Sequence, residues 1–387
     1  MRVNLEKRIP VWQERGLISA EVGEKILSFE EQTGSRNWVG FGIAGIGVTA
    51  LMTGLVSLLA AHWEEISASL KLLLYFALQL TLGGLFLRAE RNHGVWREAS
   101  LALFALSFFL GIGLIGQIYN LSGPWWRTLS FWLVLALGPT SFAESKFLPR
   151  LWCVTVLAAS LLWVIEADMP PSEFGRVCWW LAVPFFLAFL GFHGGEGGVV
   201  RSHFRNALVV IGIGSVVILS SMFGSFLWSE GQLPLRDDRE VWFIGVPWIV
   251  ALFAASASIR RRPAPEAARC LTAALIVTSA VWLTVPVLFP LKLLFPGLVL
   301  NRVLGAAGFL LVWSLAAAAA ARADRRRLFD LASFVIALRL IVVYFEVFGS
   351  LTTTGLGLVL SGVVILGVGA AWTRLRGAVH RFARGAP

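Results

Sequence analysis

The residues of this 387-residue chain that are best suited to chemistry are charged side chains in apolar surroundings. The clearest is Arg339, near the middle of the apolar stretch 328–350, with Tyr344 and Glu346 following it. A charge at the centre of a bilayer costs about 2.5–3.5 kcal/mol on insertion scales, so it marks a candidate functional site. Arg339 and Glu346 lie seven residues apart, roughly 10 Å along a helix, which is too far for a direct pair. We therefore expect Arg339 to meet a carboxylate or a backbone carbonyl of another helix.

Polar residues also gather at the ends of other apolar segments. The groups are Glu64 and Glu65 between the first two segments with Lys71 just inside the second, Gln117, Tyr119 and Asn120 at the end of the third, and Glu166 and Asp168 at the end of the fifth. By the topology below, these groups share the extracytoplasmic side, and Glu64, Glu65 and Glu166 are candidate partners of Arg339. We expect a polar cavity there, in which Arg339 binds an anionic group. Its lining would be Arg339, Glu346, Tyr344, Gln117, Tyr119, Asn120, Glu64, Glu65 and Lys71. Each residue taken alone also fits a structural role, as a solvated turn, a helix cap or a buried ion pair.

No enzyme signature accompanies these groups. The sequence has no HExxH, no GxxxxGK[ST] and no GxSxG motif. Cys153, Cys178 and Cys270 are isolated, and such cysteines are usually small buried hydrophobic residues. We expect no catalytic residue, no metal site and no cofactor.

The composition indicates a membrane protein. Hydrophobic residues make up 57% of the chain and charged residues 14%, far from the balance of a soluble domain. Long apolar segments predict an all-α bundle of transmembrane helices, because a β-barrel would show short alternating strands. The twelve predicted spans are 39–61, 69–87, 99–119, 128–143, 149–167, 177–193, 206–228, 241–259, 270–290, 302–321, 328–348 and 351–372. The shortest are 128–143 and 177–193, and residues 290–300 are a candidate interfacial or re-entrant piece.

The distribution of basic residues sets the expected orientation. Roughly three quarters of the 33 lysines and arginines fall in the two terminal segments and the even-numbered loops, which the positive-inside rule assigns to the cytoplasm. We expect an even number of crossings, with both termini cytoplasmic. The net charge of +10 is then an insertion signal, and no nucleic-acid partner is expected.

Three regions follow from this reading: a cytosolic helical hairpin at 1–36, the bundle at 37–373 and a basic cytosolic tail at 374–387. In the hairpin, Gly16 should end the first helix and Ser19 should cap the second. The hairpin is either a packing element or a surface that binds a regulatory partner.

Small residues recur every fourth position in the first and last spans. They are Gly45, Thr49, Thr53 and Ser57 in the first span, and Gly357 and Ser361 in the last. Such spacing lets helix backbones approach closely. Besides the lipid bilayer itself, a second copy of the chain or another membrane protein could bind at these faces.

Four motifs of the chain resemble those of a known protein family. They are Trp12-x3-Gly16-Leu17-Ile18, Trp63-x2-Ile66-x4-Lys71, the block Gly116-Gln117-Ile118-Tyr119-Asn120-Leu121-Ser122-Gly123, and Arg339-x4-Tyr344-Phe345-Glu346. The chain resembles the bacterial predicted membrane proteins called domain of unknown function 2157, over residues 1–145 and, more loosely, over the last 60 or so. The resemblance implies a multi-pass protein of the bacterial cytoplasmic (inner) membrane. The family brings no established activity, so no residue role carries over.

Two functions remain open from the sequence. One is a transporter or a lipid- or small-molecule-handling protein that uses the polar cavity near the extracytoplasmic face. The other is a non-catalytic scaffold or envelope-stress component that acts through its hairpin and its helix-packing faces. An intramembrane enzyme is the weakest reading, because no nucleophile–base pair is visible.

Overall fold

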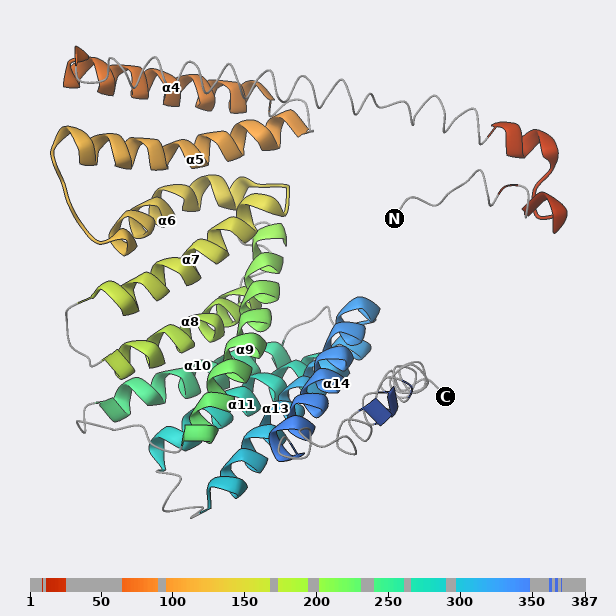
Figure 1. Ribbon diagram of the computed structural model, residues 1–387. Helices are drawn as coiled ribbons and strands as arrows, with labels where there is room; N and C mark the ends of the chain where they lie inside the picture. Colours follow the sequence, from red (N-terminus) through yellow and green to blue (C-terminus); the bar gives the residue numbers. More distant parts are fainter. Residues whose placement is uncertain are drawn as a thin grey trace. The chain divides into compact units, whose positions relative to one another are not determined.

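The computed structural model describes the chain in separate stretches. They are residues 9, 12–25, 65–89, 95–167, 173–193, 202–230, 240–260, 266–289 and 297–348, with residues 362, 363, 366, 367 and 370. These stretches contain helices and turns and no strand, which confirms the all-α class. The helices of this part of the chain that Figure 1 labels are α4 (Ala68–Ala89), α5 (Val95–Ile118), α6 (Trp125–Phe142), α7 (Phe147–Glu166), α8 (Glu173–His193), α9 (Ser202–Glu230), α10 (Glu240–Arg260), α11 (Glu266–Leu288), α13 (Leu298–Arg322) and α14 (Arg326–Phe348).

Each of these helices covers one apolar segment predicted from the sequence. Several begin about a turn earlier, because polar residues beside the apolar run continue the helix. The helix α5 begins at Val95, for example, while its apolar segment begins at 99. The predicted spans 39–61 and 351–372 lie outside the described residues, apart from a few positions of the second. Of the piece 290–300, the last residues form the first turn of α13.

Seven of the described helices are long and apolar enough to cross a membrane, namely α4, α5, α7, α8, α9, α11 and α13. The helix α10 has 21 residues, with Pro247 among them. The helix α6 has only 18 residues, with Pro139 among them, and α14 carries Arg339 within its apolar run. The chain is a multi-pass helical membrane protein, and the total of twelve spans stays a prediction.

The chain divides into two units, residues 1–73 and 74–387, and each is described on its own. In the first unit, Gly16 has φ +68°, and the N–H groups of Gly16 and Leu17 donate to the carbonyls of Gln13 and Trp12. This pattern is a Schellman motif, which ends a helix at a residue in the left-handed region. The Oγ of Ser19 accepts from the N–H of Val22 at 3.3 Å, so the predicted cap is present.

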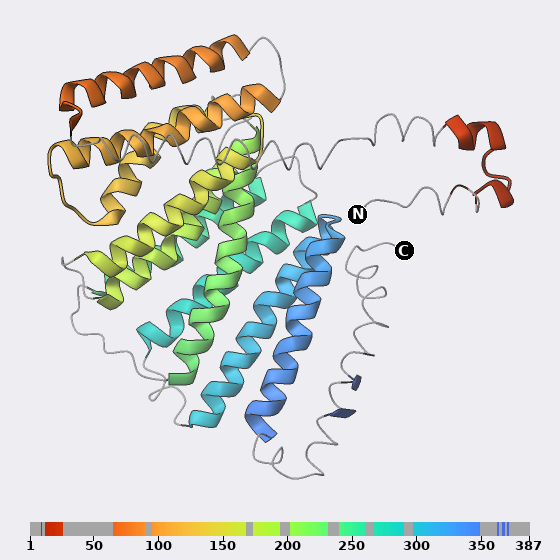
Figure 2. The same ribbon diagram turned by 45° about the horizontal axis from the view of Figure 1, so that its top comes forward.

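In the second unit, α9 has the most helix neighbours, since it contacts α7, α8, α11 and α13, and α8 lies beside it. The helix α8 contacts α7, α9 and α10, while α11 packs on α10, α9 and α13. The largest apolar core joins α8 to α11 through Phe185, Ile276 and Leu283. At the two sides of the unit, α5 packs on α6, and α14 packs on α13 (Figures 1 and 2).

The contact between α9, α11 and α13 depends on glycines. A β-carbon on Gly224 would lie 2.8 Å from the ring of Trp282, and one on Gly308 would lie 2.5 Å from its Nε1. The indole of Trp282 is therefore held between two bare stretches of backbone. Beside it, Trp228 Nε1 donates to the carbonyl of Trp282 at 3.2 Å.

We expect Gly224→Ala and Gly308→Ala each to lower the stability of the folded chain by about 1–3 kcal/mol, because the buried indole must shift. Thermal unfolding in lipid nanodiscs measures the loss. The matched control is Gly214→Ala on α9, where a β-carbon meets nothing within 4 Å. Equal melting temperatures for all three variants would show that close packing of the Trp282 ring against these two glycines does not contribute to stability.

Candidate functional site

Several of the predicted site residues lie where the structure gives no side chain. Glu64, Gly45, Thr49, Thr53, Ser57, Gly357 and Ser361 are outside the described residues. For Glu346 only the helical backbone of α14 is described. Glu65 is exposed and Lys71 is half-buried, and both belong to the first unit. The structure therefore leaves the roles of these residues as predictions.

The block Gln117-Ile118-Tyr119-Asn120 ends helix α5. Asn120 has φ +49°, the N–H of Leu121 donates to the carbonyl of Gly116 at 2.9 Å, and the N–H of Asn120 donates to that of Gln117 at 3.4 Å. This is a Schellman motif in which Asn120 takes the left-handed position. The side chain of Tyr119 is 61% exposed, and Gln117 is also exposed. Asn120 thus has a structural role, while the side chains of Gln117 and Tyr119 face the surroundings of the bundle.

Arg339 meets an aromatic ring of another helix. Its guanidinium lies 5.6 Å from the ring centroid of Phe309 on α13, and Phe309 in turn lies 6.1 Å from Trp313. A cation over an aromatic face is stabilised by the ring quadrupole, more strongly where water is excluded. Among the acidic candidates, Glu166 accepts the backbone N–H of Trp126 at 3.4 Å. The ring of Phe309 belongs to another helix, while the carboxylate or backbone carbonyl expected from the sequence as the partner of Arg339 stays a prediction.

Gln117 and Arg339 lie on helices with different neighbours. Gln117 ends α5, which packs on α6, whereas Arg339 lies on α14, which packs on α13. In both views α5 and α14 are on different sides of the second unit (Figures 1 and 2). The structure therefore does not bring these two residues together.

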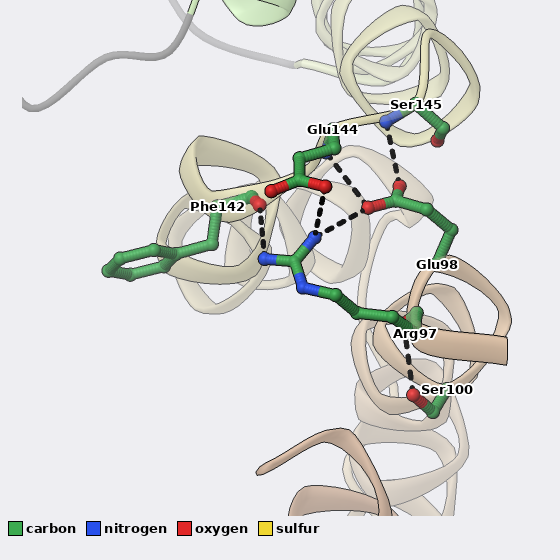
Figure 3. Close-up of polar contacts among 6 residues, drawn as sticks. All are labelled: Arg97, Glu98, Ser100, Phe142, Glu144 and Ser145. Atoms are coloured by element: carbon green, nitrogen blue, oxygen red, sulfur yellow. Dashed lines mark hydrogen bonds and ion pairs between the residues drawn. The ribbon is translucent and has the colours of Figure 1, made fainter. Parts of the chain in front are cut away.

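The sequence reading missed a buried charge cluster near the start of α5, shown in Figure 3. The side chain of Arg97 is 1% exposed, and its Nη1 lies 2.9 Å from Glu98 Oε1 and 3.4 Å from Glu144 Oε2. Its Nη2 donates to the carbonyl of Phe142 at 3.3 Å. That carbonyl is at the C-terminus of α6, where the helix dipole favours a positive charge.

Glu98, the next residue of α5, binds the link that follows α6. Its Oε1 accepts the N–H of Glu144 at 2.9 Å, and its Oε2 accepts the N–H of Ser145 at 2.8 Å. Both donors lie in the short link between α6 and α7, as Figure 3 shows. Two consecutive residues of α5 therefore fix the end of one helix and the link to the next. Adjacent Arg and Glu in a sequence look like ordinary loop charges, so only the three-dimensional packing reveals this cluster.

The opposite end of α6 is also held by a charge from a neighbouring helix. Trp126 is the second residue of α6, and its N–H has no partner within the helix. The carboxylate of Glu166, the last residue of α7, accepts from it. A negative charge at the N-terminus and a positive charge at the C-terminus both complement the dipole of α6.

A cavity of about 170 Å³ lies between α8, α9, α10 and α11. Its wall includes Leu181, Phe226, Pro247 and Leu283, and it is almost entirely apolar. Thr284 also lines it, but its hydroxyl donates to the carbonyl of Ala280 within its own helix. None of the residues predicted for the polar cavity lines it. The described residues contain no group of three or more His, Cys, Asp or Glu that could hold a metal ion.

Residues 10–149 match the model of the family described as Predicted membrane protein (DUF2157). The match confirms the resemblance drawn from the N-terminal motifs and from the Gly116–Gly123 block. The cluster around Arg97 lies within the matched part, whereas Arg339 and the cavity lie beyond it. No curated protein and no solved structure matches the chain.

We expect Arg97→Ala to destabilise the chain by about 1–3 kcal/mol, because it removes the buried cation beside the partly exposed Glu98 and Glu144 and the donor to the carbonyl of Phe142. Unfolding measured in nanodiscs gives this difference. Arg150→Ala is the matched control, since Arg150 is exposed on α7. Similar losses for the two variants would contradict a special role for the cluster.

Proposed function

We propose that this multi-pass membrane protein, whose N-terminal part matches a family of predicted membrane proteins, handles lipids or other small apolar molecules. The observation that carries the proposal is the apolar cavity between α8, α9, α10 and α11. Binding sites for small molecules are concave and mostly apolar, and the space between helices of a bundle is a common place for them.

The position of the cavity supports this proposal. Val177 and Leu181 lie near the start of α8, Pro247 lies near the start of α10, and Phe226 and Val287 lie near the ends of their helices. At 1.5 Å per residue, all of these positions are within roughly 12 Å of a helix end. Half of a hydrocarbon core is about 15 Å thick, so the cavity fits within one leaflet. With both termini in the cytoplasm, as the loop charges predict, this is the outer leaflet.

The polar residues predicted near the extracytoplasmic face have a second role in this function. Arg339, Tyr344 and Gln117 are predicted on the same side of the membrane, where they could attract an anionic group. The cavity supplies no charge of its own for such a group. In this proposal the cavity takes the apolar part of the molecule, and the polar residues act at the surface.

We expect vesicles that contain the full chain to move a headgroup-labelled fluorescent phospholipid between leaflets faster than empty vesicles, as followed by dithionite quenching. Val177→Phe should slow this movement by roughly tenfold, because a larger side chain fills the cavity. Val154→Phe is the matched control, since Val154 is 52% exposed on α7 and does not line the cavity.

Two outcomes of this assay would count against the proposal. One is a rate of phospholipid movement equal to that of empty vesicles, together with no passage of a soluble anionic solute across the membrane. The other is equal slowing by Val177→Phe and Val154→Phe. Arg339→Ala and Gln117→Ala, measured in the same assay, test the role of the polar residues. Wild-type rates of lipid movement in both variants would exclude that role without contradicting the role of the cavity.

A scaffold role is the second candidate, and the hairpin favours it. Leu17 is 67% exposed and Val22 is 44% exposed, although both are apolar. A contiguous exposed apolar patch is typical of a surface that binds another protein, and these two side chains are its candidates on the hairpin. In this reading the hairpin recruits a partner while the bundle serves as its anchor.

We expect deletion of residues 2–34 to abolish recovery of such a partner in a pull-down from native membranes, while the rest of the chain stays folded. Leu17→Ser with Val22→Ser should have the same effect, because it removes the apolar contact alone. Unchanged recovery with the deletion would exclude this role for the hairpin.

A further inference from the structure

One residue of the cavity wall is exposed at the outside of the bundle. Leu181, Leu283 and Val287 are buried, with exposures of 6%, 6% and 4%, whereas Phe226 is 54% exposed. Phe226 lies on α9, one of the helices that can span the membrane, so its exposed face is covered by lipid. The cavity therefore has lipid directly outside its wall.

The chemistry of the wall selects an apolar occupant. No charged residue lines the cavity, and the hydroxyl of Thr284 is already bonded to Ala280. A polar headgroup placed there would lose its hydrogen bonds to water and gain none in return. The thiol of Cys178 is the other hetero-atom of the wall, and a thiol behaves as a small hydrophobe.

The size of the cavity selects a single chain. An engineered apolar cavity of about 150 Å³ stays free of water and binds benzene. The volume of about 170 Å³ is similar, so it accepts a short run of methylene groups but is too small for a molecule of four fused rings. Because the cavity fits within one leaflet, a lipid of that leaflet can insert part of a chain while its headgroup stays at the interface.

Resting on the proposed function, we infer that the cavity binds one acyl chain of a bilayer lipid, which enters beside Phe226. The surrounding lipid is the most abundant apolar molecule that this wall meets. The walls formed by Leu181 and Leu283 contact the chain, and neither contributes a polar group. Recognition is therefore by length and thickness of the hydrocarbon, and the headgroup is not selected by the cavity.

A photoreactive phospholipid tests this inference, with a diazirine in the acyl chain and the full-length protein in nanodiscs. Bulk lipid labels exposed residues everywhere, so the informative adducts are those on the buried wall residues Leu283, Thr284 and Val287. We expect such adducts in the wild type. Val177→Phe should reduce them by roughly tenfold, the effect of excluding about two methylene groups from a buried site. Adducts on the exposed residue Phe253 serve as the internal reference.

The controls separate filling of the cavity from a general disturbance. Val154→Phe should leave the adducts on the buried wall unchanged. If Val177→Phe does not fold, as judged by size-exclusion chromatography, Leu181→Phe fills the same space, with Leu190→Phe as its matched control because Leu190 is 37% exposed on α8.

Adducts confined to exposed residues would overturn the inference, as would adducts on the buried wall that persist in both filled variants. Purified protein that carries a non-lipid apolar molecule in place of these adducts would also overturn it. The result is separable from the proposed function. Adducts on the buried wall without lipid movement in vesicles would support the bound acyl chain and contradict the lipid-handling function. Lipid movement without adducts on the buried wall would support the function and contradict the bound chain.

Discussion

The constraint on which the second unit depends is the cost of leaving charges and backbone polar groups without partners in hydrocarbon. The short helix α6 shows how the chain meets it. Glu166 of α7 accepts a backbone N–H at one end of α6, and Arg97 of α5 donates to a backbone carbonyl at the other. Both charges match the helix dipole, so neighbouring helices stabilise α6, which with 18 residues is the shortest of the labelled helices. Glu98 then fixes the link from α6 to α7, which sets the position of α7 beside it.

The same constraint explains the roles of glycine and aromatic residues at two further helix contacts. Between α9, α11 and α13, Gly224 and Gly308 leave room for the ring of Trp282, so the helices approach without a polar group between them. On α13 and α14, the face of Phe309 receives Arg339. Lipid supplies no hydrophobic driving force between helices, so such close packing and local polar contacts hold the bundle together.

Much of the fold could be predicted from the sequence, because apolar length and charge bias are local properties. The helices α4 to α14, the turn at Gly16 and the cap at Ser19 all follow from neighbouring residues. The cluster around Arg97 could not be predicted, because Phe142 and Glu144 are about 45 residues away in sequence. The cavity leaves no sequence signal either, since a lining leucine resembles any other core leucine. For Asn120 the sequence allowed both a binding role and a helix cap, and its positive φ shows that it ends a helix.

The central claim is that an apolar cavity within one leaflet receives a lipid chain, while charged residues hold the frame around it. The wall includes Phe226, whose side chain is exposed at the outside of the bundle, and Pro247, which cannot donate a backbone hydrogen bond. The most direct test is an experimental density map of the full chain in lipid nanodiscs. The account predicts elongated density beside Leu181 and Thr284 that leaves the bundle next to Phe226. A space filled by repacked side chains, with no density between α8 and α11, would contradict it.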